Sequence, residues 1–247
     1  MKLFVLKEPP SFDSKVCIAL KDDYHYLVRV RRLSVGHVFT AVEPSGKQGR
    51  ILIQKIEHDR LLGTWEELPS QTFNEARVIL FPALLKGNKL DDVLRASTEC
   101  GIIEWQPWIA RFSQVHHENK NTLIRWKNIS EQAMMQSGRS SFVTINPPLP
   151  LQELSEALNK CKTLVVFHHL PELSESLHSI LSTHEDPIGL VFGPEGGIHE
   201  EEIHYFQKNR ARFSWLGHAI LKSETAIISG LASLHTILRE FNSWKIQ

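Results

Sequence analysis

The sequence contains no long apolar run, and this lack excludes a membrane-spanning helix. No apolar stretch within its 247 residues approaches the roughly 20 residues that cross a bilayer. The first twenty residues are interrupted by Lys7, Glu8, Pro9, Pro10 and Asp13, so they lack the continuous apolar centre of a secretory signal. We therefore expect the protein to stay in the cytoplasm.

Cysteine is scarce as well. Its three copies, Cys17, Cys100 and Cys161, are widely spaced and form no CxxC pair. This pattern argues against a disulfide framework and a structural zinc site, and it predicts buried free thiols. The pairs His116-His117 and His168-His169 make poor joint metal ligands, because neighbouring side chains on a strand point to opposite faces. We expect no bound metal.

Neither sign of charge is in excess over the whole chain. Lys and Arg number 28, as do Asp and Glu, so the net charge gives no indication of a polyanionic partner. Residues 15–55 differ, because eight basic residues there stand against three acidic ones. This local surplus fits either a nucleic-acid-binding surface or the ordinary charged face of a solvated strand.

The first seventy residues have the pattern of short strands separated by turns. We expect strands at 16–20, 27–31, 38–42, 50–56 and 62–66. Gly36, Gly49 and the cluster at 44–46 separate them, and this spacing favours a small β-barrel. The pattern changes after Pro69-Ser70-Gln71, which predicts one domain at 1–71 and a second at 72–247.

In the second domain, apolar strand runs alternate with helical patterns. We expect strands at 77–82, 102–106, 163–167, 188–192 and 213–216, and helices at 88–100, 122–136, 151–159, 173–182, 199–208 and 224–241. Such repeats predict an α/β fold with a mainly parallel sheet covered by helices on both faces. Ligands bind at the carboxyl ends of these strands, so the loops after Phe167, Phe192 and Leu216 are the candidate site.

The loop Gly193-Pro194-Glu195-Gly196-Gly197 follows one of these strands directly. Its glycines permit positive φ and a close approach of a ligand to the backbone, although such a loop is often only a tight turn. Glu200, Glu201 and Glu202 open the next helix, where they suit the helix dipole but repel a phosphate. The sequence also has no GxxxxGK[ST] segment and no GxGxxG segment after a strand, which excludes P-loop and dinucleotide-binding sites.

The segment 215–226 joins the last strand to the last helix. Ser223 is suited to cap that helix, and Glu224 is suited to its first turn. Ile227, Leu231, Leu234 and Leu238 then recur at helical spacing, which indicates a core or dimer seam.

GPEGG after an apolar strand, followed by LG-x-x-IL-x-x-ETA at the start of the last helix, closely resembles the RsmE family of 16S ribosomal RNA uracil-N3 methyltransferases. The resemblance extends over nearly the whole chain. Its other motifs are Arg29-Val30-Arg31-Arg32-Leu33 with Gly36, Lys86-Gly87-Asn88-Lys89, Thr98-Glu99-Cys100-Gly101, Arg125-Trp126, and Glu131 with Gln136-Ser137-Gly138-Arg139.

This resemblance implies a PUA-like RNA-binding barrel at 1–71 and a SPOUT domain with a trefoil knot at 72–247, which works as a homodimer with the last helix at its seam. The implied cofactor is S-adenosylmethionine, held in the knot largely by main chain. Its implied contacts are Phe167, His168, Gly193, Glu195, Gly196, Gly197, Leu216, Gly217, Leu221, Ser223 and Thr225. The implied contacts to ribosomal RNA are Arg29, Arg31, Arg32, Lys86 and Arg139.

The implied reaction needs a base or an anion stabiliser, because uracil N3 carries a proton. Lys222 is the candidate to stabilise the anion, and Glu224 is the nearest candidate to accept the proton. The structural alternative is that Lys222 only satisfies main-chain carbonyls and Glu224 only caps the helix. Aligning N3 with the methyl group favours a rigid pocket over a metal.

The sequence departs from the family at Ala219 and Lys222, where arginine is usual. Alanine offers no donor, and an ammonium cannot reproduce a bidentate guanidinium. Arg111 and Arg139 are candidates to compensate; otherwise activity or RNA substrate has changed, or the chain is an RNA-binding protein without catalysis. A Rossmann-type methyltransferase is disfavoured, because no glycine-rich turn follows the strand near Phe81.

Overall fold

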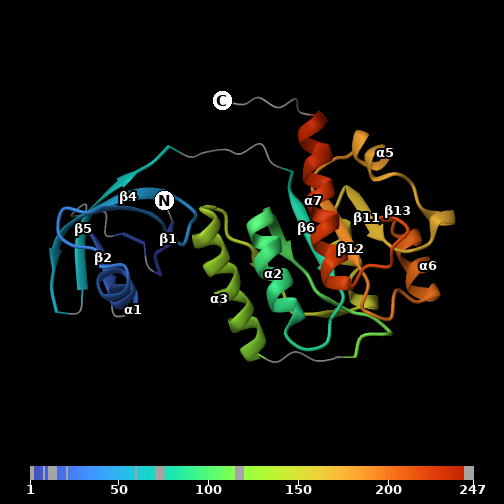
Figure 1. The fold of residues 1–247 in the computed structure, drawn as a ribbon, viewed down its shortest axis with the longest axis horizontal. Coiled ribbons are helices and arrows are strands. Elements are labelled where there is room, and N and C mark those ends of the chain that lie inside the picture. Colours follow the sequence, from blue (N-terminus) through green and yellow to red (C-terminus); the bar gives the residue numbers. More distant parts are fainter. Residues whose placement is uncertain are drawn as a thin grey trace. The chain divides into compact units, whose positions relative to one another are not determined.

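The computed structural model describes residues 3–7, 9–10, 16–20, 22–58, 60–69, 76–114 and 120–241. The chain divides into two compact units, whose elements are labelled in Figure 1. Unit 1 comprises Met1–Phe73 together with Glu131–Phe142, and unit 2 comprises Asn74–Ser130 and Val143–Gln247.

Unit 1 is built on a five-stranded sheet in the order β1-β3-β4-β5-β2. Its strands are β1 (Phe4–Val5), β2 (Val16–Leu20), β3 (Val38–Val42), β4 (Gln48–Ile56) and β5 (Arg60–Glu67). All pairs are antiparallel except β1 with β3. In β4, Ile51 and Ile53 are buried while Arg50 and Leu52 face outward, which is the two-residue period of a strand covered on one face.

Two apolar clusters pack unit 1. The larger joins Phe4, Leu6, Leu27, Phe39, Ala41, Ile51, Ile53 and Leu61. The smaller joins Leu3, Val5 and Val42 to Met134 of α3 (Lys120–Ser137). The first part of unit 2, Asn74–Ser130, lies between these strands and Met134 in the sequence, so unit 1 is closed by a segment distant in sequence.

The predicted strand at 27–31 is wrong, because these residues continue from α1 (Asp22–Tyr24) into a π-helical turn, η2 (His25–Val30). Apolar and basic residues alternate in this segment, as they do in a half-exposed strand, and its valines favour strand structure. In the structure, however, only Leu27 of η2 is buried. The main-chain N–H groups of Arg31 and Leu33 donate to the carbonyls of Tyr26 and Leu27, so this turn satisfies its polar groups without a partner strand.

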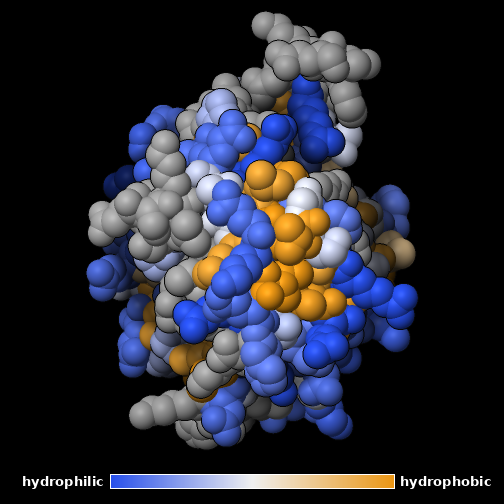
Figure 2. Space-filling model, turned by 90° about the vertical axis from the view of Figure 1, so that its left-hand side faces the viewer, coloured by the Kyte–Doolittle hydropathy of each residue, from blue (hydrophilic) through white to orange (hydrophobic). Residues whose placement is uncertain are grey.

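Exposed apolar side chains gather on unit 1. They are Val30, Val35, Val38 and Leu52, of which Val38 and Leu52 are directly paired across β3 and β4. Figure 2 looks toward this unit and shows an apolar patch bordered by hydrophilic residues. Arg29, Arg31 and Arg32 are exposed on either side of Val30.

Unit 2 contains a six-stranded, wholly parallel sheet in the order β13-β11-β12-β6-β7-β9. The strands are β6 (Val78–Pro82), β7 (Ile102–Trp105), β9 (Thr144–Ile145), β11 (Thr163–Phe167), β12 (Ile188–Phe192) and β13 (Arg212–Ser214). Every residue of β6, β11 and β12 is buried, as expected for central strands covered on both faces. The prediction of an α/β fold with a parallel sheet is confirmed.

Helices cover both faces of this sheet. One face packs against α2 (Lys89–Cys100), α5 (Leu177–Ser182) and α7 (Ser223–Phe241), and the other against α4 (Ser155–Asn159) and α6 (Glu200–Lys208). A short parallel pair, β8 (Trp108–Ile109) with β10 (Leu149–Pro150), lies outside the main sheet.

Two predicted helices begin later than expected. The predicted helix at 173–182 starts at Leu177, because a 3-10 turn, η4 (Pro171–Leu173), comes first and the N–H of Glu175 donates to the carbonyl of Phe213. The predicted helix at 151–159 is divided between a 3-10 turn, η3 (Leu151–Glu153), and α4.

The last helix, α7, differs from the prediction in where it begins, and its apolar stripe performs one of the two predicted roles. It begins at Ser223 itself, so Ser223 is its first residue rather than the residue before it. The stripe Ile227, Leu231, Leu234 and Leu238 is buried in the core of unit 2. Of the two predicted roles, core packing is the one this stripe performs within the chain.

No helix in the described part of the chain is long and apolar enough to cross a membrane. The thiols of Cys100 and Cys161 are only half-buried, and burial raises the pKa of Cys161 to about 12. The side chain of Cys17 and the pair His116-His117 lie outside the described residues.

Candidate active site

A cavity of about 370 Å³ lies in unit 2 at the carboxyl ends of β11, β12 and β13, where parallel sheets place their ligands. Nine of the eleven predicted cofactor contacts line it. They are Phe167, His168, Gly193, Glu195, Gly197, Leu216, Gly217, Leu221 and Ser223. Gly196 and Thr225 do not, and of the two predicted catalytic residues Lys222 lines the cavity and Glu224 does not.

One wall is formed by the last residues of two neighbouring strands. The rings of Phe167 and Phe192 are stacked, with centroids 4.7 Å apart and planes within 9°. Gly230 of α7 lies directly behind them, since a Cβ there would come within 2.7 Å of Phe192 Cζ. Only a glycine lets the helix approach this closely without moving the rings.

His168 and His169 both line this cavity. The alternation rule holds on a strand, but β11 ends at Phe167. The His168 N–H donates to the carbonyl of Ser214 (3.0 Å). Burial and the neighbouring His169 lower the pKa of His168, so its imidazole is neutral at neutral pH. Trp215 packs edge-on against His218, with ring centroids 4.8 Å apart.

The carboxylate of Glu195, a predicted cofactor contact, is hydrogen-bonded to other residues of the chain. Its Oε1 accepts hydrogen bonds from Lys89 Nζ (2.7 Å) and from the main-chain N of Lys86 (3.4 Å). Burial opposes ionisation of Glu195, but these hydrogen bonds hold its pKa below the usual value. The pKa of Lys89 is raised by the same hydrogen bond.

Glu224 lies next to this pair. Its Oε2 is 3.7 Å from Lys89 Nζ and has no hydrogen-bond partner in the described part of the chain. Lys222 is exposed, and its carbonyl accepts the N–H of Ala226 (2.8 Å). Lys222, the residue before α7, therefore lines the cavity, whereas Glu224, in the first turn of α7, does not.

A family described as an RNA methyltransferase domain matches residues 72–235. The chain belongs to this family. Ribosomal RNA small subunit methyltransferase E 2 of Borreliella burgdorferi is 28% identical and spans 98% of this chain and 100% of its own length. Ribosomal RNA small subunit methyltransferase E of Synechocystis is 29% identical over 87% of this chain and 71% of its own.

A solved structure of similar fold extends this comparison to the whole chain. It is a ribosomal RNA small subunit methyltransferase E from Neisseria gonorrhoeae bound to S-adenosyl methionine, 25% identical, with a TM-score of 0.80 over 96% of this chain and 98% of its own. The likeness covers both units of this RNA methyltransferase.

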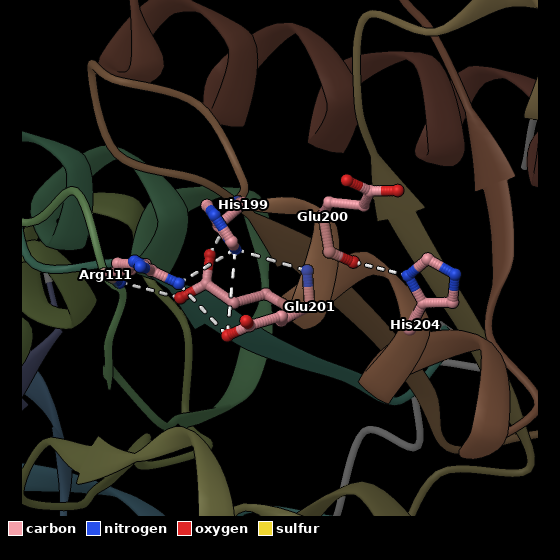
Figure 3. A network of polar contacts seen from close by, with 6 residues as sticks. Arg111, His199, Glu200, Glu201 and His204 are labelled. Atoms are coloured by element: carbon pink, nitrogen blue, oxygen red, sulfur yellow. Dashed lines mark hydrogen bonds and ion pairs between the residues drawn. The ribbon is translucent and has the colours of Figure 1, made fainter.

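Arg111 was one candidate to compensate for the family arginines that are absent at Ala219 and Lys222, but it does not lie at the cavity. It follows β8, and its Nη1 donates to Glu201 Oε2 (3.0 Å) and lies 3.4 Å from His199 Nδ1 (Figure 3). Its main-chain N donates to the buried Glu202 (2.7 Å). Arg111 is thus engaged at the first turn of α6, and it does not line the cavity.

His199 and Glu202 form a capping box at this first turn, with the His199 N–H donating to Glu202 Oε2 (2.8 Å). Gly196 packs closely against Phe112, since a Cβ on Gly196 would meet Phe112 Cβ at 2.7 Å. His204 instead contacts the carbonyl of Glu200 within the helix (2.7 Å). The described residues contain no group of three or more His, Cys, Asp or Glu that could hold a metal.

The predicted RNA contacts are distributed over both units. Arg29, Arg31 and Arg32 are exposed in unit 1, and Arg139, also in unit 1, donates to Ser141 Oγ (3.3 Å). Lys86 is exposed in unit 2, in the segment that leads into α2.

Sequence reasoning missed several cavity residues of this methyltransferase. His169, Pro194, Ile198, Trp215, Ile220 and Ala226 also line it. Each of them is the immediate neighbour of a predicted contact. His169, Pro194 and Ile220 lie inside the predicted loops, and extending these loops by one residue would have included Ile198, Trp215 and Ala226.

Proposed function

We propose that the chain transfers a methyl group from S-adenosylmethionine to N3 of a uridine in 16S ribosomal RNA of the small subunit. The cavity at the carboxyl ends of β11, β12 and β13 carries this proposal, because the loops that line it hold most of the residues expected to contact the cofactor. The names of the relatives supply the substrate class, and the cofactor bound in the related Neisseria structure supplies the methyl donor.

The residues present fit the cofactor. A volume of about 370 Å³ lies in the usual range of small-molecule sites. Phe167, Leu216 and Leu221 offer apolar surface for an adenine ring, and the glycines of the 193–197 loop expose peptide groups to polar atoms. When bound there, the cofactor supplies an electrophilic methyl group on a sulfonium.

The start of α7 supplies the acid-base chemistry. Glu224 is proposed to accept the N3 proton, because it directly follows the cavity-lining residues Lys222 and Ser223. Lys222 is proposed to stabilise the resulting uracil anion. Its ammonium has no polar partner within the described part of the chain and is exposed at the cavity, so it is available to a substrate.

RNA binding is proposed to use both units. Arg29, Arg31 and Arg32 of a PUA-like barrel in 1–71, together with Lys86 and Arg139, are proposed to contact the phosphate backbone, because basic side chains supply most of the affinity for nucleic acid. The domain 72–247 is proposed to be a SPOUT domain whose C-terminal part is threaded through a trefoil knot.

We further propose a homodimer that acts in the cytoplasm on the ribosomal subunit. Since the apolar stripe of α7 is occupied by the core of unit 2, the dimer would require other surface. Ile220, 83% exposed at the cavity, is a candidate for that surface. Analytical ultracentrifugation of the wild type and of Ile220→Ser tests this, with a weaker dimer expected for the variant.

Incubation of the purified protein with labelled S-adenosylmethionine and unmethylated small subunits tests the proposed reaction. We expect label in 16S RNA, and mass spectrometry should place it on one uridine. Protein that takes up the cofactor but labels no RNA would contradict the proposal.

A second candidate function is RNA binding without catalysis. It is favoured by Ala219, which lines the cavity without offering a donor, and by Arg111, which is engaged at α6 instead. Calorimetry separates the two functions, because a binding protein of this kind would bind RNA but not S-adenosylmethionine.

A further inference from the structure

Lys89 connects three segments that are far apart in the sequence. It is the first residue of α2. Its ammonium donates to Glu195, which follows β12, and lies 3.7 Å from Glu224, at the start of α7. Glu195 itself lines the cavity, as do the two residues before Glu224. One cation therefore lies against both the loop after β12 and the first turn of the last helix.

We propose that Lys89 is a positioning residue for methyl transfer, which fixes the 193–197 loop against the first turn of α7 and orients the Glu224 carboxylate. This inference rests on the proposed function, since it concerns the residue proposed to accept the N3 proton. Lys89 does not itself line the cavity.

The charges explain why a cation is needed at this position. Glu195 and Glu224 both approach one ammonium, and without it two carboxylates would be left close together with like charge. Their side chains are 28% and 29% exposed and that of Lys89 is 38% exposed, so solvent screens the interaction only in part. A neighbouring cation favours the ionised form of a carboxylate, and a proton acceptor must be ionised to act.

Other charged groups near Lys89 are already engaged. Asp91, in the same first turn of α2, accepts from Trp126 Nε1 (3.1 Å) and pairs with Arg125 (3.3 Å). Lys86 contributes its main-chain N–H to Glu195 rather than a charge. Glu195 and Glu224 are thus the carboxylates that face Lys89 from the elements packed against α2.

The test compares two variants of Lys89, one that removes the positive charge and one that keeps it, with side chains of similar length. Lys89→Met removes the ammonium, and Lys89→Arg retains a cation. Lys162→Met is the matched control, because Lys162 pairs with the exposed Glu185 (3.4 Å) in the same unit and has no contact with the cavity. Thermal unfolding of each variant shows whether it is folded.

The first measurement needs no activity. We expect carbon-13 NMR titration of the cofactor-free protein to give a higher pKa for Glu195 in Lys89→Met than in the wild type, with Lys89→Arg close to the wild type. An unchanged Glu195 titration in Lys89→Met would overturn the inference, because Lys89 would then not control the charge at this loop.

The second measurement is the pH profile of kcat. In Lys89→Met we expect kcat to fall more at mildly acidic pH than at neutral pH, with a smaller change in KM for the cofactor, and Lys89→Arg should restore the wild-type profile. A kcat that falls equally at every pH would indicate a purely structural role and would overturn the inference. If the wild type itself methylates no RNA, the proposed function fails, while the NMR result still decides whether Lys89 positions the loop.

Discussion

Two loops that form walls of the cavity differ in how firmly they are held by the rest of the chain. The wall formed by residues 193–198, here the tied wall, is hydrogen-bonded through Glu195 to Lys89, and its Gly196 packs closely against Phe112. The wall formed by residues 215–222, here the open wall, contains four exposed residues, at 218–220 and 222, against two, at 195 and 196, in the tied wall. Under the proposed function, the tied wall would be a preorganised surface for the cofactor, and the open wall would meet the substrate.

The largest effect is expected where the open wall leads into α7. Glu224→Gln keeps the shape of the side chain but removes its ability to accept a proton at neutral pH. We expect kcat to fall by roughly 10²- to 10⁴-fold, the usual contribution of a general base. Single-turnover assays with small subunits would measure it, and calorimetry should give a cofactor Kd close to that of the wild type. A Kd weakened as much as kcat would place Glu224 in binding rather than in proton transfer.

The next effect concerns the support behind the stacked rings. In Gly230→Ala, the new methyl group would lie 2.7 Å from Phe192 Cζ, and overpacking of this kind costs about 1–3 kcal/mol. Alanine improves the helix by only about 0.5–1 kcal/mol, so the net effect is a loss. We expect Tm to fall by several degrees and cofactor binding to weaken, as measured by calorimetry and thermal unfolding.

A second substitution sharpens this prediction. Phe192→Leu removes the ring that the new methyl group meets, so adding Gly230→Ala to Phe192→Leu should cost less than adding it to the wild type. Equal costs in both backgrounds would show that the close approach of α7 is not what requires glycine at this position.

The strands β6, β11 and β12 could be predicted because each is a short, continuous apolar run buried on both faces, whereas the two-residue strands β8, β9 and β10 were not predicted. The loops followed from the strand ends, so most of the cavity lining was predictable. The segment 27–31 failed because its alternation is also compatible with one buried residue, Leu27, on a helical turn. Local pattern does not specify whether a partner strand is present.

The contact between Lys89 and Glu195 could not be predicted from local pattern, since 106 residues separate them. Each is an ordinary charged residue in its own segment. The sheet order places β12 beside β6, and only that order brings the two segments together. The role of Arg111 was missed for the same reason, because its partners in α6 lie some ninety residues away.

A smaller effect on stability and cofactor affinity is expected from the protonation of His168 at low pH. Burial and His169 lower the pKa of His168 in the folded protein, so the neutral ring is favoured there. The stability this contributes is present above the ordinary histidine pKa of about 6.5, and it is lost as pH falls through the lowered value. Protonation would also add a positive charge beside the proposed sulfonium site, so cofactor affinity should fall in the same direction.

Calorimetry from neutral to mildly acidic pH measures this dependence, with His168→Gln as the variant. We expect the affinity of the variant to change less with pH than that of the wild type. Parallel pH profiles for the two proteins would assign the dependence to another group.

The smallest effect should come from the ion pair between Arg111 and Glu201, at the first turn of α6 that follows the tied wall. The Arg111 and Glu201 side chains are 55% and 79% exposed, and exposed ion pairs contribute about 0–1 kcal/mol. Arg111→Met also leaves the main-chain N–H bond to Glu202 in place, so we expect a change in unfolding free energy below about 1 kcal/mol and an unchanged cofactor Kd. Glu202→Gln, which alters the buried acceptor of two main-chain N–H groups, should cost more, about 1–3 kcal/mol. If Arg111→Met were the more damaging of the two in urea unfolding, the tied wall would depend on the exposed ion pair rather than on the buried carboxylate.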